Sequence, residues 1–198
     1  MSQPEELVPE NGSGVQTNTE SEAVFETAQA ARQFFDIAKE RLLRINGWKE
    51  LAGIASAGFQ LTDSDGKDIF RTPEEGDFFK IDIPGPRTIT GEGHDWVQIE
   101  AVEVSGDAAA IRVRPASNPR NEREDVAHFF SDEATSSFMV KLEDNKVIAG
   151  VYGRNEKPNT KTEKLVDTVR NAAIATGAIT GFSKLQWKSL VNGIVKKD

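Results

Sequence analysis

The stretch "FMVKLEDNKVIAGV", residues 138–151, decides the fold class. Apolar side chains alternate with other residues on both sides of the tetrapeptide EDNK, at Phe138, Val140 and Leu142 and again at Val147, Ala149 and Val151. Alternation with a period of two is typical of a strand that buries one face. Asp and Asn at the centre of a short connection are typical of a hairpin turn. The stretch therefore predicts two antiparallel strands that share one core.

The same alternation recurs along the middle of the chain and predicts further strands within 57–61, 78–83, 97–104 and 109–113. Val97 and Ile99 have one parity, whereas Val102 and Val104 have the other, so we expect a β-bulge near Glu100-Ala101. Short strands joined by tight turns are typical of an antiparallel sheet.

Helical periodicity appears at both ends. Thr19 and Glu22 have the spacing of a capping box, and a stripe of apolar residues follows at intervals of three and four, at Val24, Ala28, Ala31, Phe35, Ala38, Leu42 and Ile45. Thr160 and Ser183 could begin two C-terminal helices. We therefore expect an α+β fold: a curved, mostly antiparallel sheet of about six strands, with one N-terminal helix and two C-terminal helices packed on it.

Composition predicts one domain preceded by a tail. The first 20 residues are acidic and rich in Pro, Gly, Ser and Asn, so we expect 1–20 to be disordered and 21–198 to form a single α+β domain. Residues 1–26 hold six glutamates and neither lysine nor arginine, which leaves −2 of the net charge of −8 for the rest. Residues 27–198, with a net charge of −2, lack the strong positive field of non-specific nucleic-acid binders.

The sequence contains no cysteine, so it can form neither disulfides nor thiolate metal sites. No apolar run approaches the roughly 20 residues that span a bilayer, and the N-terminus does not resemble a secretory signal. These features predict a soluble, cytoplasmic protein.

The loop 84–95 is the first candidate site. It carries prolines and glycines, which interrupt strand pairing, and it is longer than an ordinary hairpin loop. Its glycines match neither the phosphate-binding loop nor the dinucleotide fingerprint. Because long loops on a rigid sheet often carry function, we take as ligand-binding candidates Arg87, His94, Asp95 and Trp96. The alternative is a loop that only connects two strands.

Metal and catalytic signatures are missing from the sequence. His94 and Asp95 are adjacent, so in a strand they point to opposite faces, and His128 has no metal-ligand spacing around it. The segment "DSDGKD", 63–68, resembles the start of a calcium loop but places Lys67 where an oxygen ligand is needed. No serine-nucleophile motif is present. We therefore predict no catalytic residues, no metal and no cofactor.

Arginines gather in "RVRPASNPRNER", residues 112–123, where Arg112 and Arg114 share one face of a strand. Such a cluster suits phosphate or carboxylate recognition unless acidic side chains already pair with it. Arg154, Asn155 and Glu156 follow the last strand and could project toward the 84–95 loop. We add these five residues and His128 to the candidates.

The leading functional hypothesis is a non-catalytic cytoplasmic binding or adaptor protein. It would recognise a protein partner or a small anionic ligand through the 84–95 loop and the neighbouring arginines. One alternative is a small-molecule-binding protein or enzyme with a pocket between sheet and helices, lined by His94, His128, Arg154 and Glu156. Another is a weak binder of single-stranded nucleic acid.

Overall fold

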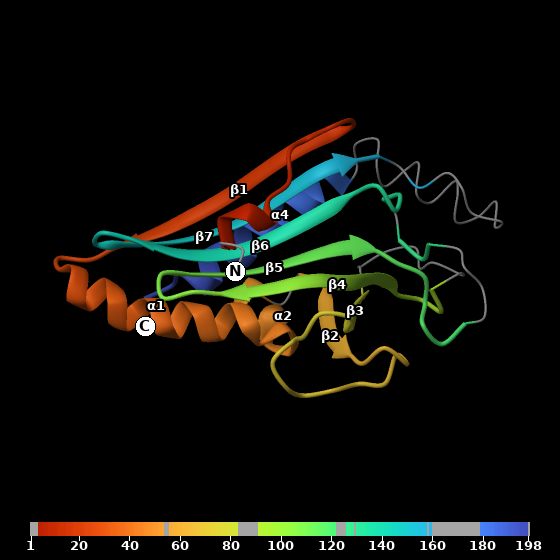
Figure 1. The fold of residues 1–198 in the computed structure, drawn as a ribbon, viewed down its shortest axis with the longest axis horizontal. Coiled ribbons are helices and arrows are strands. Elements are labelled where there is room, and N and C mark those ends of the chain that lie inside the picture. Colours follow the sequence, from red (N-terminus) through yellow and green to blue (C-terminus); the bar gives the residue numbers. More distant parts are fainter. Residues whose placement is uncertain are drawn as a thin grey trace.

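The computed structural model describes residues 4–53, 56–82, 91–121, 126–128, 130–157, 159 and 179–197. These residues form a curved antiparallel sheet that packs helices against one face (Figure 1). The predicted α+β class is therefore confirmed. No helix among the described residues is long and apolar enough to cross a membrane.

The elements follow one another along the chain in a simple order. They are the 3-10 turn η1 (Pro4–Leu7), β1 (Val15–Val24), α1 (Ala28–Leu43), η2 (Ile45–Gly47), α2 (Trp48–Ala52), β2 (Gly58–Thr62), β3 (Phe78–Asp82), β4 (Asp95–Val104), β5 (Ala108–Pro115), β6 (Thr135–Glu143), β7 (Lys146–Glu156) and α4 (Ile179–Ile194). Among the described residues, the sheet has seven strands in the order β1-β7-β6-β5-β4-β3-β2, one more than the six predicted. The additional strand is β1, which lies at the edge beside β7.

The predicted hairpin and bulge are both present. β6 pairs with β7 from Thr135↔Arg154 to Glu143↔Lys146, so the turn holds Asp144 and Asn145. The register of β4 against β5 shifts between Ile99 and Ala101, which makes Glu100 the extra residue of a bulge. The shift keeps Val97, Ile99 and Val102 against the core despite their opposite parities.

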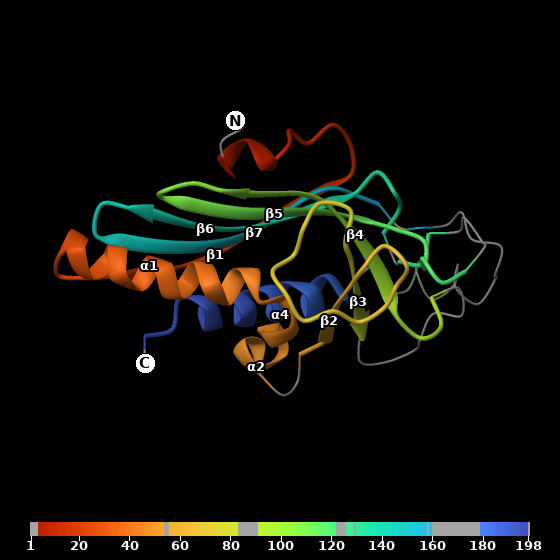
Figure 2. The same cartoon turned by 60° about the horizontal axis from the view of Figure 1, so that its bottom comes forward.

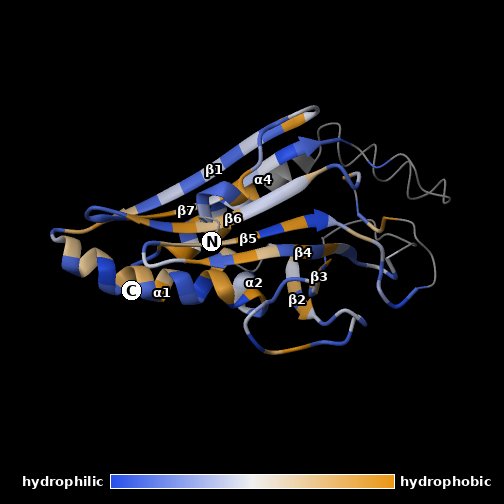
Figure 3. Ribbon diagram, viewed as in Figure 1, coloured by the Kyte–Doolittle hydropathy of each residue, from blue (hydrophilic) through white to orange (hydrophobic). Residues whose placement is uncertain are grey.

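The core lies between the sheet and the helices and is centred on aromatic side chains. Trp48 of α2 contacts Phe138 at 4.7 Å between ring centroids, and Phe59, Phe79 and Trp187 surround this pair. Figure 3 shows the strands alternating between hydrophobic and hydrophilic residues, as expected for a sheet with one face in this core.

The prediction that residues 1–20 are disordered is wrong for the part of the tail that the structure describes. Val15–Val24 forms a ten-residue strand that pairs with β7, with one register shift between Val15 and Thr17. This edge strand is mostly hydrophilic (Figure 3) because one face meets solvent and the other carries small threonine, serine and alanine side chains. Backbone pairing stabilises it without large apolar side chains, so composition gave no sign of order.

The first helix also begins later than predicted. Thr19 and Glu22 lie in β1, and the helix cap is Thr27, whose side chain accepts a hydrogen bond from the Ala30 amide at 3.1 Å. The buried stripe of α1 is confirmed at Ala31, Phe35, Ala38 and Leu42. Of the two predicted C-terminal helices, the last is α4, and the one expected from Thr160 lies outside the described residues.

The opposite, outer face of the sheet is also partly covered. Figure 2 shows the N-terminal segment crossing this face, on the side away from α1 and α4. η1 lies against β4, β5 and β6, and Leu7 is buried in a small cluster with Ala110 and Met139. The sheet therefore has one face sealed by helices and one covered locally by a short segment.

Candidate functional site

A groove of about 510 Å³ lies where the C-terminal half of α1 and η2 meet the connection between β2 and β3. We call it the α1 groove, and it is lined by Lys39, Glu40, Leu43, Arg44, Ile45, Asn46, Phe70, Arg71 and Thr72. Its two walls, residues 39–46 and 70–72, are 24 to 33 residues apart in sequence, so the fold alone brings them together.

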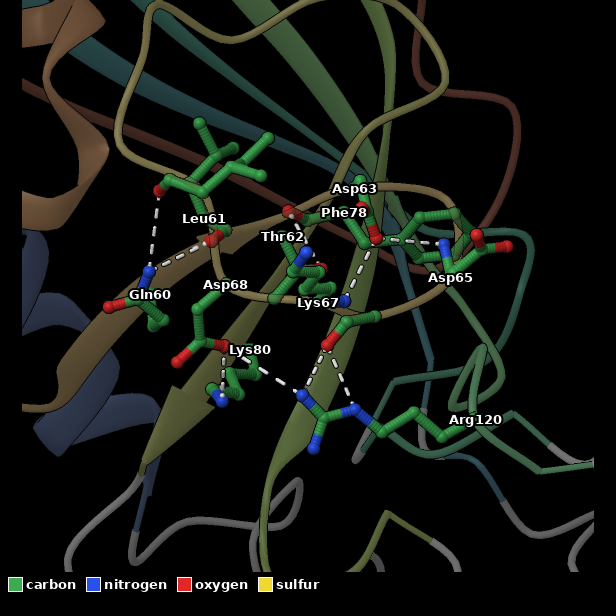
Figure 4. A network of polar contacts seen from close by, with 12 residues as sticks. Gln60, Leu61, Thr62, Asp63, Asp65, Lys67, Asp68, Phe78, Lys80 and Arg120 are labelled. Atoms are coloured by element: carbon green, nitrogen blue, oxygen red, sulfur yellow. Dashed lines mark hydrogen bonds and ion pairs between the residues drawn. The ribbon is translucent and has the colours of Figure 1, made fainter.

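The wall formed by residues 70–72 follows a tightly held turn (Figure 4). The Asp63 carboxylate accepts hydrogen bonds from the amides of Asp65 and Lys67, at 3.0 and 2.9 Å. Arg120 donates from Nε to the Gly66 carbonyl at 2.8 Å, and Lys80 pairs with Asp68 at 2.8 Å. The segment that resembles a calcium loop is thus a turn organised by donors of the protein itself.

Asn46 joins the two walls of the groove. Its side-chain amide donates to the Ile69 carbonyl at 2.9 Å, and its side-chain oxygen accepts from the Leu61 amide at 2.6 Å. The side chain therefore fixes η2 against both β2 and the residue before Phe70. Phe70 follows the anchored residue Ile69, and its side chain lies in solvent, since the residue is 83% exposed.

Arg71 is held by the buried carboxylate of Asp77, which is 5% exposed. Its Nη1 and Nη2 atoms donate to the two Asp77 oxygens at 2.7 and 2.8 Å. The Asp77 hydrogen bond also raises the pKa of Arg71. A bidentate pair of this kind fixes the guanidinium plane, and the Glu74 amide, which donates to Asp77 at 2.8 Å, ties the rest of the loop to it.

The charges of the groove are mainly positive. Lys39, Arg44 and Arg71 line it with one carboxylate, Glu40, on a protein whose net charge is −8. Lys39 pairs with Asp36 at 2.8 Å, and Arg71 pairs with Asp77 at 2.7 Å and with Glu74 at 3.6 Å. Arg44 is exposed and has no ion pair with any residue that the structure describes. The groove thus combines an available guanidinium with the exposed Phe70 ring and the half-buried Leu43.

The predicted arginine cluster lies elsewhere and is paired. Arg112 and Arg114 both donate from Nε to the carboxylate of Glu100, at 3.0 and 2.6 Å. Glu100 is the bulged residue of β4, so the bulge places this carboxylate beside the arginines of β5. Arg114 also donates to the Asp132 carbonyl at 3.4 Å. The sequence left open whether acidic side chains already pair with these arginines, and in the structure Glu100 does so.

Arg154, Asn155 and Glu156 stabilise the junction between β7 and the N-terminal segment. Arg154 is buried and donates from Nη1 to the Thr17 carbonyl, the Asn18 side chain and the Gly153 carbonyl. Asn155 accepts from the amides of Gly12 and Ser13 at 2.8 and 3.0 Å.

Glu156 accepts a hydrogen bond from Thr17 at 3.3 Å. Burial raises its pKa to about 7, and the effect of burial exceeds the opposing effects of this hydrogen bond and of Arg154. A carboxyl group with such a pKa changes its charge near neutral pH.

The remaining candidates lie at the start of β4 and in the loop before β6. Trp96 is buried and donates from its indole nitrogen to the Gly91 carbonyl at 3.1 Å. Asp95 is buried, and His128 accepts from the Phe130 amide at 3.0 Å. His94 is half-buried, and Arg87 lies outside the described residues together with most of the 84–95 loop.

None of the nine sequence candidates that the structure describes lines the α1 groove, and the groove itself was not predicted. Trp96, Arg112, Arg114 and Arg154 alternate with core residues and thus share the outer face of the sheet. One signal could have indicated the groove: "DIFRTPEEG" places a phenylalanine beside an arginine in an otherwise polar connection. In the described ranges, no three acidic or histidine side chains gather closely enough to hold a metal ion.

Comparison with known proteins establishes the fold. No family model and no curated protein matches the sequence. The hypothetical protein jhp0584 from Helicobacter pylori has a similar structure, with a TM-score of 0.58 and 12% identity over 98% of this chain and 94% of that chain. The shared architecture is a helix-grip arrangement, a curved antiparallel sheet with helices held on one face.

Two other structures are less similar. Truncated norcoclaurine synthase from Thalictrum flavum has a TM-score of 0.43 and 11% identity over 96% of this chain and 100% of that chain. Major latex-like protein 151 from Panax ginseng has a TM-score of 0.37 and 14% identity over 82% of this chain and 94% of that chain. At these identities the likeness concerns the fold alone.

Proposed function

We propose that the chain is a non-catalytic, cytoplasmic binding protein whose α1 groove takes a small anionic ligand with an apolar portion. The observation that carries the proposal is the meeting of Arg44, Arg71 and the exposed Phe70 around one concave surface. The groove volume of about 510 Å³ lies within the range of roughly 300–1,000 Å³ common for ligand sites.

Charge supports an anionic ligand. A guanidinium that no protein carboxylate occupies can pair with a carboxylate or phosphate, and Arg44 is such a group among the described residues. Arg71 lies beside it in a fixed position because Asp77 holds two of its nitrogens, and this carboxylate balances its charge. The exposed Arg44 guanidinium attracts anions to the groove, and salt screens this attraction.

Apolar contact supports an amphiphilic ligand rather than a bare anion. An exposed phenylalanine such as Phe70 loses water contact when a ligand covers it, and burying such a ring contributes about 1.5–3 kcal/mol. Asn46 anchors the residue before Phe70, so little ordering cost is expected when the ring closes on a ligand. Leu43 and the aliphatic stem of Lys39 extend the apolar surface.

The experiment is isothermal titration of the chain with dodecanoate below its critical micelle concentration. We expect saturable binding that weakens with salt, and much weaker binding of the uncharged 1-dodecanol and of the cationic dodecyltrimethylammonium. Arg44→Ala and Phe70→Ser should each weaken dodecanoate binding about tenfold, which corresponds to about 1.4 kcal/mol.

Matched variants on α4 provide the control. Leu185 is also an exposed apolar residue, at 70%, and Lys184 is an exposed cation beside it. Leu185→Ser and Lys184→Ala should leave dodecanoate binding unchanged because neither residue lines the groove. Equal affinity for the anionic and cationic amphiphiles, or equal effects of the α4 and groove variants, would contradict the proposal.

A further inference from the structure

The outer face of the sheet carries an apolar patch where solvent would otherwise lie. Ala110 of β5 and Met139 of β6 are directly paired and buried, and Ala101 and Tyr152 border them. Leu7 of η1 packs on this patch and is 4% exposed. Ser137 of β6 donates from its hydroxyl to the Leu7 carbonyl at 2.6 Å. Leu7 thus contributes a buried side chain and a hydrogen-bonded carbonyl to the contact with the outer face of the sheet.

The segment that supplies the leucine is attached to the sheet at few points. We call residues 4–14 the strap, and in it Glu5, Glu6, Glu10, Gly12 and Ser13 are exposed. Its second attachment is an exchange of hydrogen bonds: the Asn155 amide donates to the Asn11 side chain at 2.8 Å, while Asn155 accepts from Gly12 and Ser13. Gly14 follows with a φ of 81°, a turn that glycine adopts without strain.

This arrangement differs from the pairing that holds the strands. η1 is a single 3-10 turn and belongs to no strand of the sheet. Its contact rests on two buried side chains, Pro4 and Leu7, with Val8 packed beside them. A single turn held in this way opens more readily than a strand in the middle of a ladder. The strap therefore behaves as a tethered peptide on a docking surface, favoured by its high effective concentration.

We propose that this patch, formed by Ala110, Ser137 and Met139, is a docking site for an acidic, leucine-containing segment of a partner protein. The strap, with the sequence PEELVPE at 4–10, is its intramolecular occupant. The strap itself defines the chemistry of such a segment, because it docks a buried leucine between exposed glutamates at positions 5, 6 and 10. A partner segment competes with the strap and binds when the strap opens.

Methionine methyl labelling tests the proposal because the chain has two methionines, Met1 and Met139, and one of them lies under Leu7. In the full chain, Leu7→Glu should move the Met139 methyl signal toward that of an exposed methionine. Adding the synthetic peptide PEELVPENGS, residues 4–13, should return the signal toward its wild-type position in a saturable manner. The same peptide with glutamate in place of leucine should require at least about tenfold more to do so.

Val104→Glu is the matched control because it places the same charge at an exposed apolar residue of β4 outside the patch. It should leave the Met139 signal unchanged. An unmoved Met139 signal in a folded Leu7→Glu variant would overturn the proposal. So would a signal that the wild-type peptide, at millimolar concentration, does not shift.

A second variant covers the case in which Leu7→Glu does not fold. Asn11→Ala removes an exposed side chain that accepts from Asn155, and it leaves Leu7 in place. The labelled peptide, followed by fluorescence anisotropy, should bind this variant several-fold more tightly than the wild type because its strap opens more often. Equal affinities, or no binding to either protein, would contradict the proposal.

Discussion

Arg44 and the pair formed by Arg112 and Arg114 have opposite surroundings in this molecule. Arg112 and Arg114 are neighbours in sequence and share the carboxylate of Glu100. Arg44 and Arg71 are distant in sequence, yet they line one groove, and Arg44 has no carboxylate partner within the described ranges. Clustering along the sequence therefore indicates charge density, whereas availability for a ligand depends on which carboxylates the fold brings near.

The largest expected effect concerns the anchor of Arg71. Asp77→Ala removes a buried carboxylate that accepts from Arg71 and from the Glu74 amide. Because three hydrogen bonds to a buried carboxylate are lost, two of them from a guanidinium, we expect a loss of roughly 3 kcal/mol in the free energy of unfolding. Urea denaturation measures it. A loss below about 1 kcal/mol would mean that the groove wall does not depend on this pair.

Glu156 provides a contrast to Glu100, because burial rather than pairing dominates its environment. Its pKa of about 7 means that the folded state holds a proton between about pH 4.5 and 7 that the unfolded state has released. Stability should therefore fall as pH rises through this window. Relative to the wild type, Glu156→Gln should gain about 2 kcal/mol in unfolding free energy between pH 5 and pH 8. Parallel pH profiles for the two proteins would contradict this expectation.

The next prediction tests the ion pairs of Arg112 and Arg114 with Glu100. Glu100→Gln keeps the shape of the side chain but removes the charge that both arginines share. Because the pairs are partly buried, we expect a destabilisation of about 1–2 kcal/mol, measured by urea denaturation. The variant should also bind inorganic phosphate weakly and in a salt-dependent way. Wild-type stability together with unchanged phosphate binding would show that the arginines do not depend on Glu100.

The smallest stability effect is expected at Arg44. Since this side chain is exposed and makes no ion pair among the described residues, Arg44→Ala should change the unfolding free energy by no more than about 0.5 kcal/mol. Thermal and urea unfolding check this value beside the tenfold loss of dodecanoate binding. A strongly destabilised Arg44→Ala protein would assign the residue to the fold rather than to a ligand.

The features that could be predicted from the sequence are those in which side chains pack into the core. Phe138, Val140 and Leu142 alternate because they meet the aromatic core, and the parity change after Ile99 revealed the bulge. β1 was missed because an edge strand is stabilised by its backbone ladder and needs few apolar side chains. The first helix was extended into this strand because Thr19 and Glu22 fit a capping box by spacing alone.

The candidate site was beyond prediction for a different reason. The two walls of the groove, residues 39–46 and 70–72, become neighbours because α1 and η2 pack beside β2. No local sequence pattern indicates that these two segments lie close together. The pairing of Arg112 and Arg114 also depends on the direction of a bulged side chain. The bulge could be predicted from parity, but the direction of Glu100 could not.

The most direct test of the central claim compares two double variants in a dodecanoate titration. Arg44→Ala with Phe70→Ser removes the available cation and the exposed ring of the α1 groove, while Arg112→Ala with Arg114→Ala removes the paired cluster. We expect the first to abolish measurable binding and the second to retain wild-type affinity. Retained binding in the groove variant, or its loss in the Arg112/Arg114 variant, would contradict the account.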